Sequence, residues 1–281
     1  MTDTILVIGA TGKTGRRLVP LLQSKNLIVR AASRRPDTEQ IAFDWDDATA
    51  HDATLAGVQA IYLIPPEFVE DPIPAIAPFL ARAAAAGARR VVLLSSMGAG
   101  FPSEPAHSGR RKLETLVRES GLDATILRPS GFMQNFSEGF LLPAVRNGRI
   151  PNPAGDGQAA MVDAGDIAAV AVEILANPST HIGQTYDITG PTPIGFADAA
   201  KLIANAAGYP VAVQPIGSPQ FRGMLESAGL PADYAAMLVR DQESVRDGAA
   251  DSVSDAVERI TGKRPTDFAS YAAGAAAVWR S

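Results

Sequence analysis

Residues 4–15 read TILVIGATGKTG: an apolar run leads directly into a turn that contains three glycines. The run has the length and composition of a buried strand, and an amphipathic segment of helical length follows the turn. Gly9 permits a tight turn, Gly12 lets the backbone approach a pyrophosphate, and Gly15 lets the helix pack closely on the strand. This pattern predicts a dinucleotide site. Its predicted binding residues are Gly9, Thr11, Gly12, Lys13, Thr14 and Gly15.

Two alternatives compete with this interpretation of the glycine turn. Gly12, Lys13 and Thr14 also resemble the end of a P-loop, which binds the phosphates of a mononucleotide. That motif requires a glycine five positions before Gly12, where Val7 stands, and this argues against a P-loop. The other alternative is a glycine turn that binds no ligand.

The second predicted strand, residues 27–32, is followed by Ser33, Arg34 and Arg35. An NAD-specific site usually has an acidic residue here, which binds the ribose 2′-hydroxyl. A hydroxyl and guanidinium groups suit a 2′-phosphate instead, because planar arginine side chains pair well with phosphate oxygens. We therefore predict NADP(H) as the cofactor; the alternative is that both arginines are merely solvated. Asp44, which follows the third strand, is a candidate for contact with adenine or a plain surface charge.

The first half of the chain alternates apolar runs with segments of helical length. We predict strands over residues 4–9, 27–32, 41–44, 58–64, 90–95 and 123–128. Helices are predicted over 13–24, 49–56, 73–86 and 107–120. This alternation is typical of a Rossmann-type α/β fold, a doubly wound parallel sheet with its first strand near the middle.

The regular alternation of strands and helices ends after residue 129. The later sequence predicts helices over 132–146, 166–176, 196–207 and 268–279 and strands over 184–189 and 211–216. The stretch 148–157 is rich in proline and glycine. We expect a dinucleotide-binding domain over residues 1–150. A smaller, mostly helical substrate-binding lobe over residues 151–281 is expected to interleave with the sheet and cover its carboxyl edge.

Composition and charge exclude several classes of protein. A net charge of −5 argues against a nucleic-acid binder, which needs a basic surface. The chain has no cysteine, and its three histidines lack the spacing of metal ligands, so no metal site is predicted. The start of the sequence lacks the features of a signal peptide, and the alanine-rich stretch 76–92 contains arginines. We expect a cytoplasmic protein without a membrane partner, either a monomer or a homodimer.

The Tyr-x-x-x-Lys pair of conventional short-chain dehydrogenases, which supplies a proton to the substrate, is missing: none of the five tyrosines has a lysine four positions later. Ser95 ends the fifth predicted strand, where that superfamily has its catalytic serine, and we expect it near the nicotinamide with Pro65 and Pro66. His107 lies roughly in the tyrosine's place and is a candidate proton donor or a structural residue at a helix start. Lys112 could reach the nicotinamide ribose or face solvent.

Longer motifs accompany the glycine turn. They are ASRR at 32–35, LSS at 94–96, LRPSGFMQNF at 127–136 and VDAGDIA at 162–168. Together they resemble the NmrA-like, atypical short-chain dehydrogenase family. Three further segments are similar to the festuclavine and agroclavine dehydrogenases of ergot alkaloid biosynthesis and their bacterial relatives: FDW at 43–45, IPP at 64–66 and TGKRPTDF at 261–268. The likeness runs nearly from end to end.

The resemblance implies an NADPH-dependent reductase that acts on C=N or iminium bonds, or a relative that acts on quinones or dyes. Family members also lack the tyrosine–lysine pair, which is consistent with hydride delivery to an already cationic carbon. The small conjugated substrate would be oriented beside the cofactor. A competing hypothesis, which also follows from the family, is an NADP(H)-sensing regulator that binds a protein partner and catalyses nothing.

Aromatic, methionine and amide side chains after the sixth strand are the candidates for contact with this substrate. They are Phe132, Met133, Asn135, Phe136 and Met161, with Val162 beside them. The alternative is that the phenylalanines and methionines form ordinary core and that Asn135 caps a helix. The candidate proton donors are His107, Asp163 and water.

Overall fold

The computed structural model describes residues 3–280, which form two compact units. The first unit comprises the chain up to Ala99, Pro105–Arg128 and Ile167–Asp187; the second comprises Gly100–Glu104, Pro129–Asp166 and the chain from Ile188. This division differs from the predicted ranges 1–150 and 151–281. The reason is that residues 167–187 return to the first unit, where they contribute most of a helix and of the last strand of its sheet.

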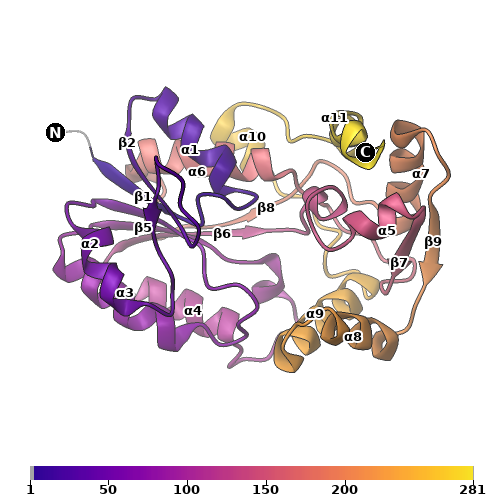
Figure 1. Ribbon diagram of the computed structural model, residues 1–281, viewed down its shortest axis with the longest axis horizontal. Helices are drawn as coiled ribbons and strands as arrows, with labels where there is room; N and C mark the ends of the chain where they lie inside the picture. Colours follow the sequence, from indigo (N-terminus) through magenta and orange to yellow (C-terminus); the bar gives the residue numbers. More distant parts are fainter. Residues whose placement is uncertain (1–2, 281) are drawn as a thin grey trace. The chain divides into compact units, whose positions relative to one another are not determined.

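The first unit is built on a seven-stranded sheet. Its strands are β1 (Thr4–Ile8), β2 (Ile28–Ser33), β3 (Ile41–Ala42), β4 (Ala60–Leu63), β5 (Arg90–Leu94), β6 (Asp123–Pro129) and β8 (Thr185–Ile188). They lie in the order β3-β2-β1-β4-β5-β6-β8 (Figure 1). The pairs from β3 through to β6 are parallel, and in the register Ile5 pairs with Val29 on one side and Ala60 on the other. The predicted Rossmann-type sheet is confirmed, and its strand order reverses at β1, where such sheets bind ligands.

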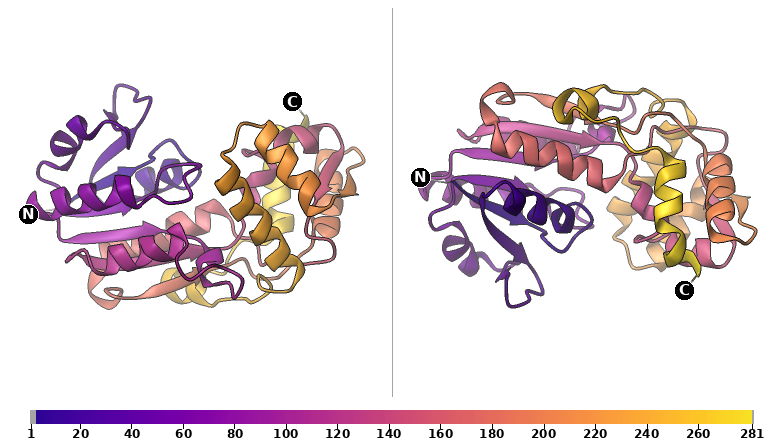
Figure 2. Two further views of the ribbon diagram at one scale, coloured as in Figure 1. Left: turned by 90° about the horizontal axis from the view of Figure 1, so that it is seen from below. Right: turned by 90° about the horizontal axis from the view of Figure 1, so that it is seen from above.

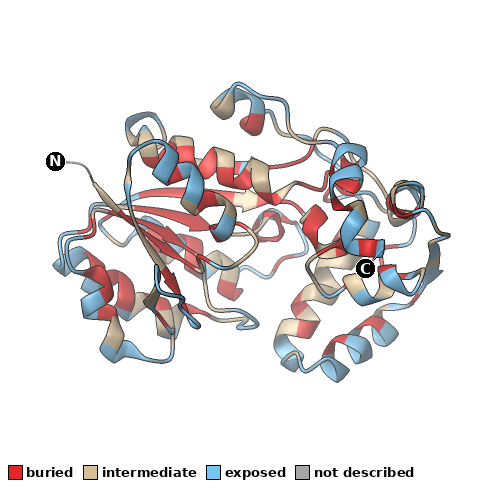
Figure 3. Ribbon diagram, turned by 45° about the horizontal axis from the view of Figure 1, so that its top comes forward, coloured by how far each residue is buried: buried red, intermediate tan, exposed pale blue. Residues whose placement is uncertain are grey.

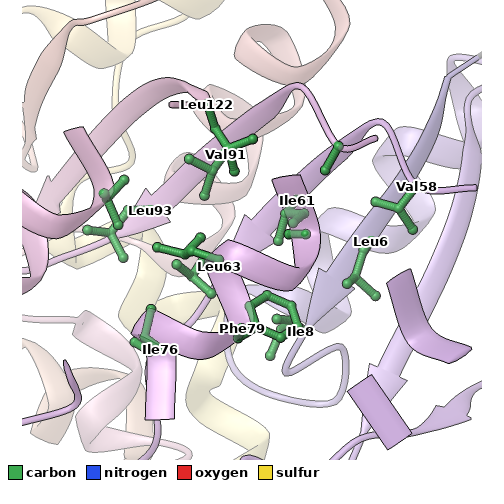
Figure 4. Packing of buried hydrophobic residues seen from close by; sticks show 14 of the residues in the cluster. Leu6, Ile8, Val58, Ile61, Leu63, Ile76, Phe79, Val91, Leu93 and Leu122 are labelled. Atoms are coloured by element: carbon green, nitrogen blue, oxygen red, sulfur yellow. The ribbon is translucent and has the colours of Figure 1, made fainter. Parts of the chain in front are cut away.

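Helices cover both faces of this sheet. Helices α1 (Gly15–Ser24) and α6 (Ala164–Ala176) lie on one face, and α2 (His51–Leu55), α3 (Ile73–Ala85) and α4 (Gly109–Arg118) lie on the other (Figure 1). Because both faces are buried, the central strands read as continuous apolar runs (Figure 3). Leu6, Ile61 and Val91 are neighbours in register across β1, β4 and β5 and belong to one buried cluster with Phe79 of α3 (Figure 4). Each such buried side chain contributes roughly 1.5–3 kcal/mol.

The second unit is mostly helical. Its two-stranded parallel sheet pairs β7 (Arg149–Asn152) with β9 (Ala212–Pro215). Its helices are η3 (Met133–Phe136), α5 (Leu142–Arg146), α7 (Phe196–Ala207), α8 (Ser218–Ser227), α9 (Ala232–Arg246), α10 (Ala256–Thr261) and α11 (Phe268–Arg280). Helices α7 and α11 lie side by side, and α8 packs on α9 (Figure 2).

One prediction for this region is wrong, and one strand was not predicted. The expected single helix over 132–146 is broken into η3 and α5. A Cβ on Gly139 would lie 3.0 Å from the Cα of Asn135, so the chain folds back tightly between the two helices. Pro143 lacks an N–H and suits the first turn of a helix, and α5 accordingly begins at Leu142. The proline-rich stretch 148–157 contains β7, whose partner strand is remote in the sequence.

Candidate dinucleotide site

The glycine turn between β1 and α1 has the backbone geometry that its sequence predicts. Gly9 has a φ of +70°, and its carbonyl accepts a hydrogen bond of 2.9 Å from the N–H of Gly12. A Cβ on Gly15 would lie 2.2 Å from the Gly9 carbonyl oxygen and 2.8 Å from the Cα of Ala10. The start of α1 therefore lies directly against the turn. The first N–H groups of a helix have no partner within it, so this arrangement suits a phosphate group.

The remaining residues of the turn differ in exposure. Thr11 is exposed, Lys13 is half-buried, and Thr14 is buried above Tyr62 of β4. Burial raises the pKa of the Tyr62 hydroxyl far above its usual range, and the neighbouring Thr14 side chain lowers that pKa by less. Tyr62 therefore stays neutral and enclosed at physiological pH. It does not replace the missing catalytic tyrosine.

The end of β2 presents one buried hydroxyl and two exposed cations. The Ser33 side chain is 4% exposed, and within residues 3–280 its Oγ atom has no hydrogen-bond partner. A buried polar atom without a partner costs free energy, so this hydroxyl suits a ligand that would pair with it. Arg34 and Arg35 are both exposed, and Arg34 Nη2 lies 2.6 Å from Glu67 Oε2. Together with the glycine turn, these residues fit the adenosine half of a dinucleotide.

Asp44 follows β3, the edge strand next to β2. It is exposed, and its Oδ1 atom accepts a hydrogen bond of 3.2 Å from the N–H of Asp46. Its backbone carbonyl lies 3.0 Å from a ring nitrogen of the buried His51. The carboxylate is accessible for the predicted contact with adenine, which stays a prediction.

The segment after β4 is tied to the start of α4. Pro65 and Pro66 are half-buried and open this segment. Asp71 lies near the far end of the segment, and its Oδ2 atom is 2.9 Å from Nζ of Lys112 in α4. The hydrogen bond between them raises the pKa of Lys112 and lowers the pKa of Asp71. Lys112 thus lies at the surface with a partner, and its contact with a nicotinamide ribose stays a prediction.

A charged network lies behind the carboxyl end of β5, and the sequence analysis missed it. The Glu114 side chain of α4 is 3% exposed and accepts hydrogen bonds from the Ser95 hydroxyl at 2.7 Å and from Arg128 at 2.8 and 2.6 Å. Arg118 also contacts it, at 3.1 Å. Burial alone would raise the pKa of Glu114, but these hydrogen bonds and charges outweigh burial and lower it. The Ser95 hydroxyl therefore donates a hydrogen bond to the Glu114 carboxylate.

The sequence carried a signal for this network. Glu114 lies three positions before Val117 and next to Leu113, so it belongs to the buried face of α4. Arg128 follows the apolar residues of β6 in a strand that is otherwise buried. Charged residues at such positions are rarely buried unless they pair with each other. Two opposite charges on core-facing positions thus pointed to a buried ion pair.

The two side chains predicted as proton donors have different surroundings. His107 is exposed two residues before α4, whose N-terminus is capped by Ser108. The helix-start role considered for His107 therefore belongs to Ser108. Asp163 immediately precedes α6; its carboxylate accepts hydrogen bonds of 2.6 Å from the N–H of Gly165 and from Gln134 Nε2. It acts as a helix cap, as its position before α6 predicts, and a role in proton transfer stays a prediction for both residues.

The predicted substrate-binding residues all lie in the second unit. Met133, Phe136 and Met161 are buried, whereas Phe132 and Asn135 are half-buried. The ring of Phe136 packs edge-on against Phe196 and Phe268, at centroid distances of 6.0 and 5.5 Å. The alternative role of Asn135 as a helix cap is wrong, because Asn135 lies inside η3 and Phe132 occupies the N-cap position.

Three of the motifs that carry the family resemblance meet in this unit. Asp166 accepts a hydrogen bond of 2.7 Å from the N–H of Thr266, so the segment 162–168 contacts the segment 261–268. Burial raises the pKa of Asp166, and this hydrogen bond lowers it by less. Gln134 joins the segment 127–136 to Ala164 through a hydrogen bond of 2.8 Å. These motifs therefore form one packed structural core.

No group of three or more histidine, aspartate or glutamate side chains is arranged to hold a metal ion within residues 3–280. None of the helices formed by those residues combines the length and the apolar character that a membrane-spanning helix needs.

Comparison with known proteins gives three concordant results. Residues 9–178 match the family described as NAD(P)H-binding. The chain is 39% identical to the uncharacterized oxidoreductase YesF of Bacillus subtilis over 99% of its length and 97% of that protein. It is 30% identical to agroclavine dehydrogenase of Claviceps fusiformis over 98% of each chain. Among solved structures, an NADPH-dependent quinone oxidoreductase from Escherichia coli in complex with NADPH has the same fold, with a TM-score of 0.80, 23% identity and coverage of 96% and 99%.

Proposed function

The chain belongs to the NmrA-like, atypical short-chain dehydrogenases within the NAD(P)H-binding family, and from this premise we propose that it is an NADPH-dependent reductase of small, conjugated C=N or iminium compounds. That it is an NAD(P)H-dependent oxidoreductase follows from the family and from its relatives. The preference for NADPH and the nature of the acceptor are the proposal.

The end of β2 is the observation that supports NADPH. Ser33 provides a buried hydroxyl without a partner, and Arg34 and Arg35 provide exposed guanidinium groups beside it. A 2′-phosphate carries close to two negative charges at neutral pH and accepts several charge-assisted hydrogen bonds. The turn at Gly9–Gly15 would hold the pyrophosphate, and Ser95, Pro65 and Pro66 would lie on the nicotinamide side.

The missing tyrosine–lysine pair supports an acceptor that is already cationic. The bound cofactor supplies a hydride, and an iminium carbon that accepts it becomes an amine carbon without a further proton. The chain then needs only to hold and orient its ligands, which can by itself lower a barrier by several kcal/mol. The agroclavine dehydrogenase relative supports this acceptor class. A quinone is the alternative acceptor, supported by the solved structural neighbour, and its reduction also consumes a proton, for which His107 is accessible.

Direct turnover assays test this proposal. The purified protein would be titrated with NADPH and NADH by fluorescence, and cyclic iminium ions and quinones would then be added in the same cuvette. We expect NADPH oxidation with at least one cyclic iminium compound. Faster turnover of every quinone would favour the quinone oxidoreductase, and tight binding without oxidation of any acceptor would instead support the sensing regulator.

Arg34→Ala is expected to weaken NADPH binding by about 1.5–3 kcal/mol, as for the loss of a charge-assisted contact. NADH lacks the 2′-phosphate, so its affinity should stay nearly unchanged. Fluorescence titration of both cofactors measures the difference. Arg82→Ala is the matched control, because Arg82 is another exposed arginine in an ion pair, at 2.9 Å from Asp52. An equal loss for NADPH and NADH in Arg34→Ala would contradict a 2′-phosphate contact.

A further inference from the structure

The Arg34–Glu67 ion pair connects two strands that are not neighbours. Arg34 follows β2 and Glu67 comes shortly after β4, and these strands flank β1 on its two sides. Glu67 Oε2 lies 2.6 Å from Arg34 Nη2. The pair therefore bridges the sheet at the carboxyl end of β1, where the glycine turn begins. Glu67 therefore binds the Arg34 guanidinium group with which the 2′-phosphate of NADP(H) would pair.

The position of Glu67 is supported by the rest of its segment. Phe68, the next residue, has a φ of +61°, a left-handed conformation that costs a non-glycine residue free energy. Further along, the carboxylate of Glu70 accepts a hydrogen bond of 3.2 Å from the N–H of Gly109. A Cβ on Gly109 would lie 1.7 Å from the Glu70 carbonyl oxygen, so the segment lies directly against the start of α4. The segment is thus anchored at α4 and turned back toward β2.

A carboxylate at this place affects the two cofactors in opposite ways. It competes with a 2′-phosphate for the Arg34 guanidinium, since both groups accept the same hydrogen bonds. A phosphate bound beside Glu67 would also be repelled by its charge. The 2′-hydroxyl of NADH has no negative charge and can donate a hydrogen bond to a carboxylate, which is how acidic residues after β2 bind it in NAD-specific sites.

We propose that Glu67 is a specificity-determining residue: by pairing with Arg34 it reduces the preference for NADPH over NADH that the Ser33-Arg34-Arg35 segment would otherwise produce. This inference rests on the proposed function, because it assumes that Arg34 binds the 2′-phosphate. It makes Glu67 the acidic group that the end of β2 lacks, supplied from the other side of β1.

Binding of cofactor fragments tests Glu67 without any turnover. The probes are 2′,5′-ADP, which carries the 2′-phosphate, and 5′-AMP, which does not, measured by calorimetry together with NADPH and NADH. We expect Glu67→Gln to bind 2′,5′-ADP and NADPH about 3–5-fold more tightly than the wild type does, in the range of a single surface charge interaction. Binding of 5′-AMP should stay within about twofold, and NADH should bind equally or more weakly. The gain should shrink at high salt.

Two further variants make the test specific. Asp52→Asn removes another exposed carboxylate that pairs with an arginine, Arg82, and should leave all four affinities unchanged. In an Arg34→Ala background, Glu67→Gln should strengthen 2′,5′-ADP binding by less than it does in the wild type, because only the relief of charge repulsion remains and the competition for Arg34 is gone. A wild type that binds 2′,5′-ADP no more weakly than Glu67→Gln overturns the proposed role of Glu67. A wild type that binds neither NADPH nor 2′,5′-ADP overturns the proposed function instead.

Discussion

Glu114→Ala is expected to lower the free energy of unfolding by about 3–5 kcal/mol, the usual cost of removing one partner from a buried ion pair. The substitution leaves the partly buried Arg128 without its carboxylate partner and the Ser95 hydroxyl without its acceptor. Both groups would remain largely withdrawn from water. Urea denaturation at neutral pH, followed by circular dichroism, measures the loss.

Two variants calibrate this effect. Asp52→Asn breaks an exposed ion pair with Arg82 and should cost less than about 1 kcal/mol. Glu114→Gln keeps the shape of the side chain and one acceptor but removes the charge, so its loss should lie between the other two. If Glu114→Ala were no more destabilising than Asp52→Asn, the network would contribute nothing to stability.

The same network predicts a pH dependence. Burial would raise the pKa of Glu114, but the hydrogen bonds from Arg128 and Ser95 and the charges of Arg128 and Arg118 bring it below its ordinary value of 4.5. On acidification the unfolded chain therefore takes up this proton before the folded chain does. The stabilisation is fully present above the pKa of the unfolded group and is lost as the pH falls below it, through the folded pKa. As the pH falls below about 5, the free energy of unfolding should decrease more for wild type than for Glu114→Gln.

Gly15→Ala is expected to lower the free energy of unfolding by about 3 kcal/mol, at the upper end of the usual cost of overpacking. The added Cβ would lie 2.2 Å from the Gly9 carbonyl oxygen, and backbone on both sides of the turn would have to move. Such a shift displaces the start of α1 from the phosphate. NADPH and NADH should both bind at least about tenfold more weakly, because they share the pyrophosphate.

A second glycine distinguishes steric overlap from a general effect of alanine. Gly274 lies within α11, and a Cβ there would meet no atom within 4 Å. Gly274→Ala should raise the free energy of unfolding by up to about 1 kcal/mol, because alanine favours the helix. Thermal unfolding and cofactor titration of both variants test this contrast. Gly15→Ala with wild-type stability and affinity would refute the role of the turn.

Local patterns predicted most of the first unit. The central strands β1 and β4 read as continuous apolar runs because helices bury both faces of the sheet. The second unit was harder to predict: the expected helix over 132–146 is interrupted near Gly139, and β7 pairs with a strand remote in sequence. Periodicity reports which face of a segment is buried, not where the chain must fold back.

The sequence by itself determined the glycine turn, the Rossmann-type sheet and the cations after β2, because each depends on residues that are near one another along the chain. Only the tertiary structure brought Glu67 to Arg34, and Glu114 to Ser95 and Arg128. These contacts join residues on separate strands and helices, and their strength depends on burial. Distance in space and burial, which the order of residues does not contain, therefore decided the electrostatics around the predicted site.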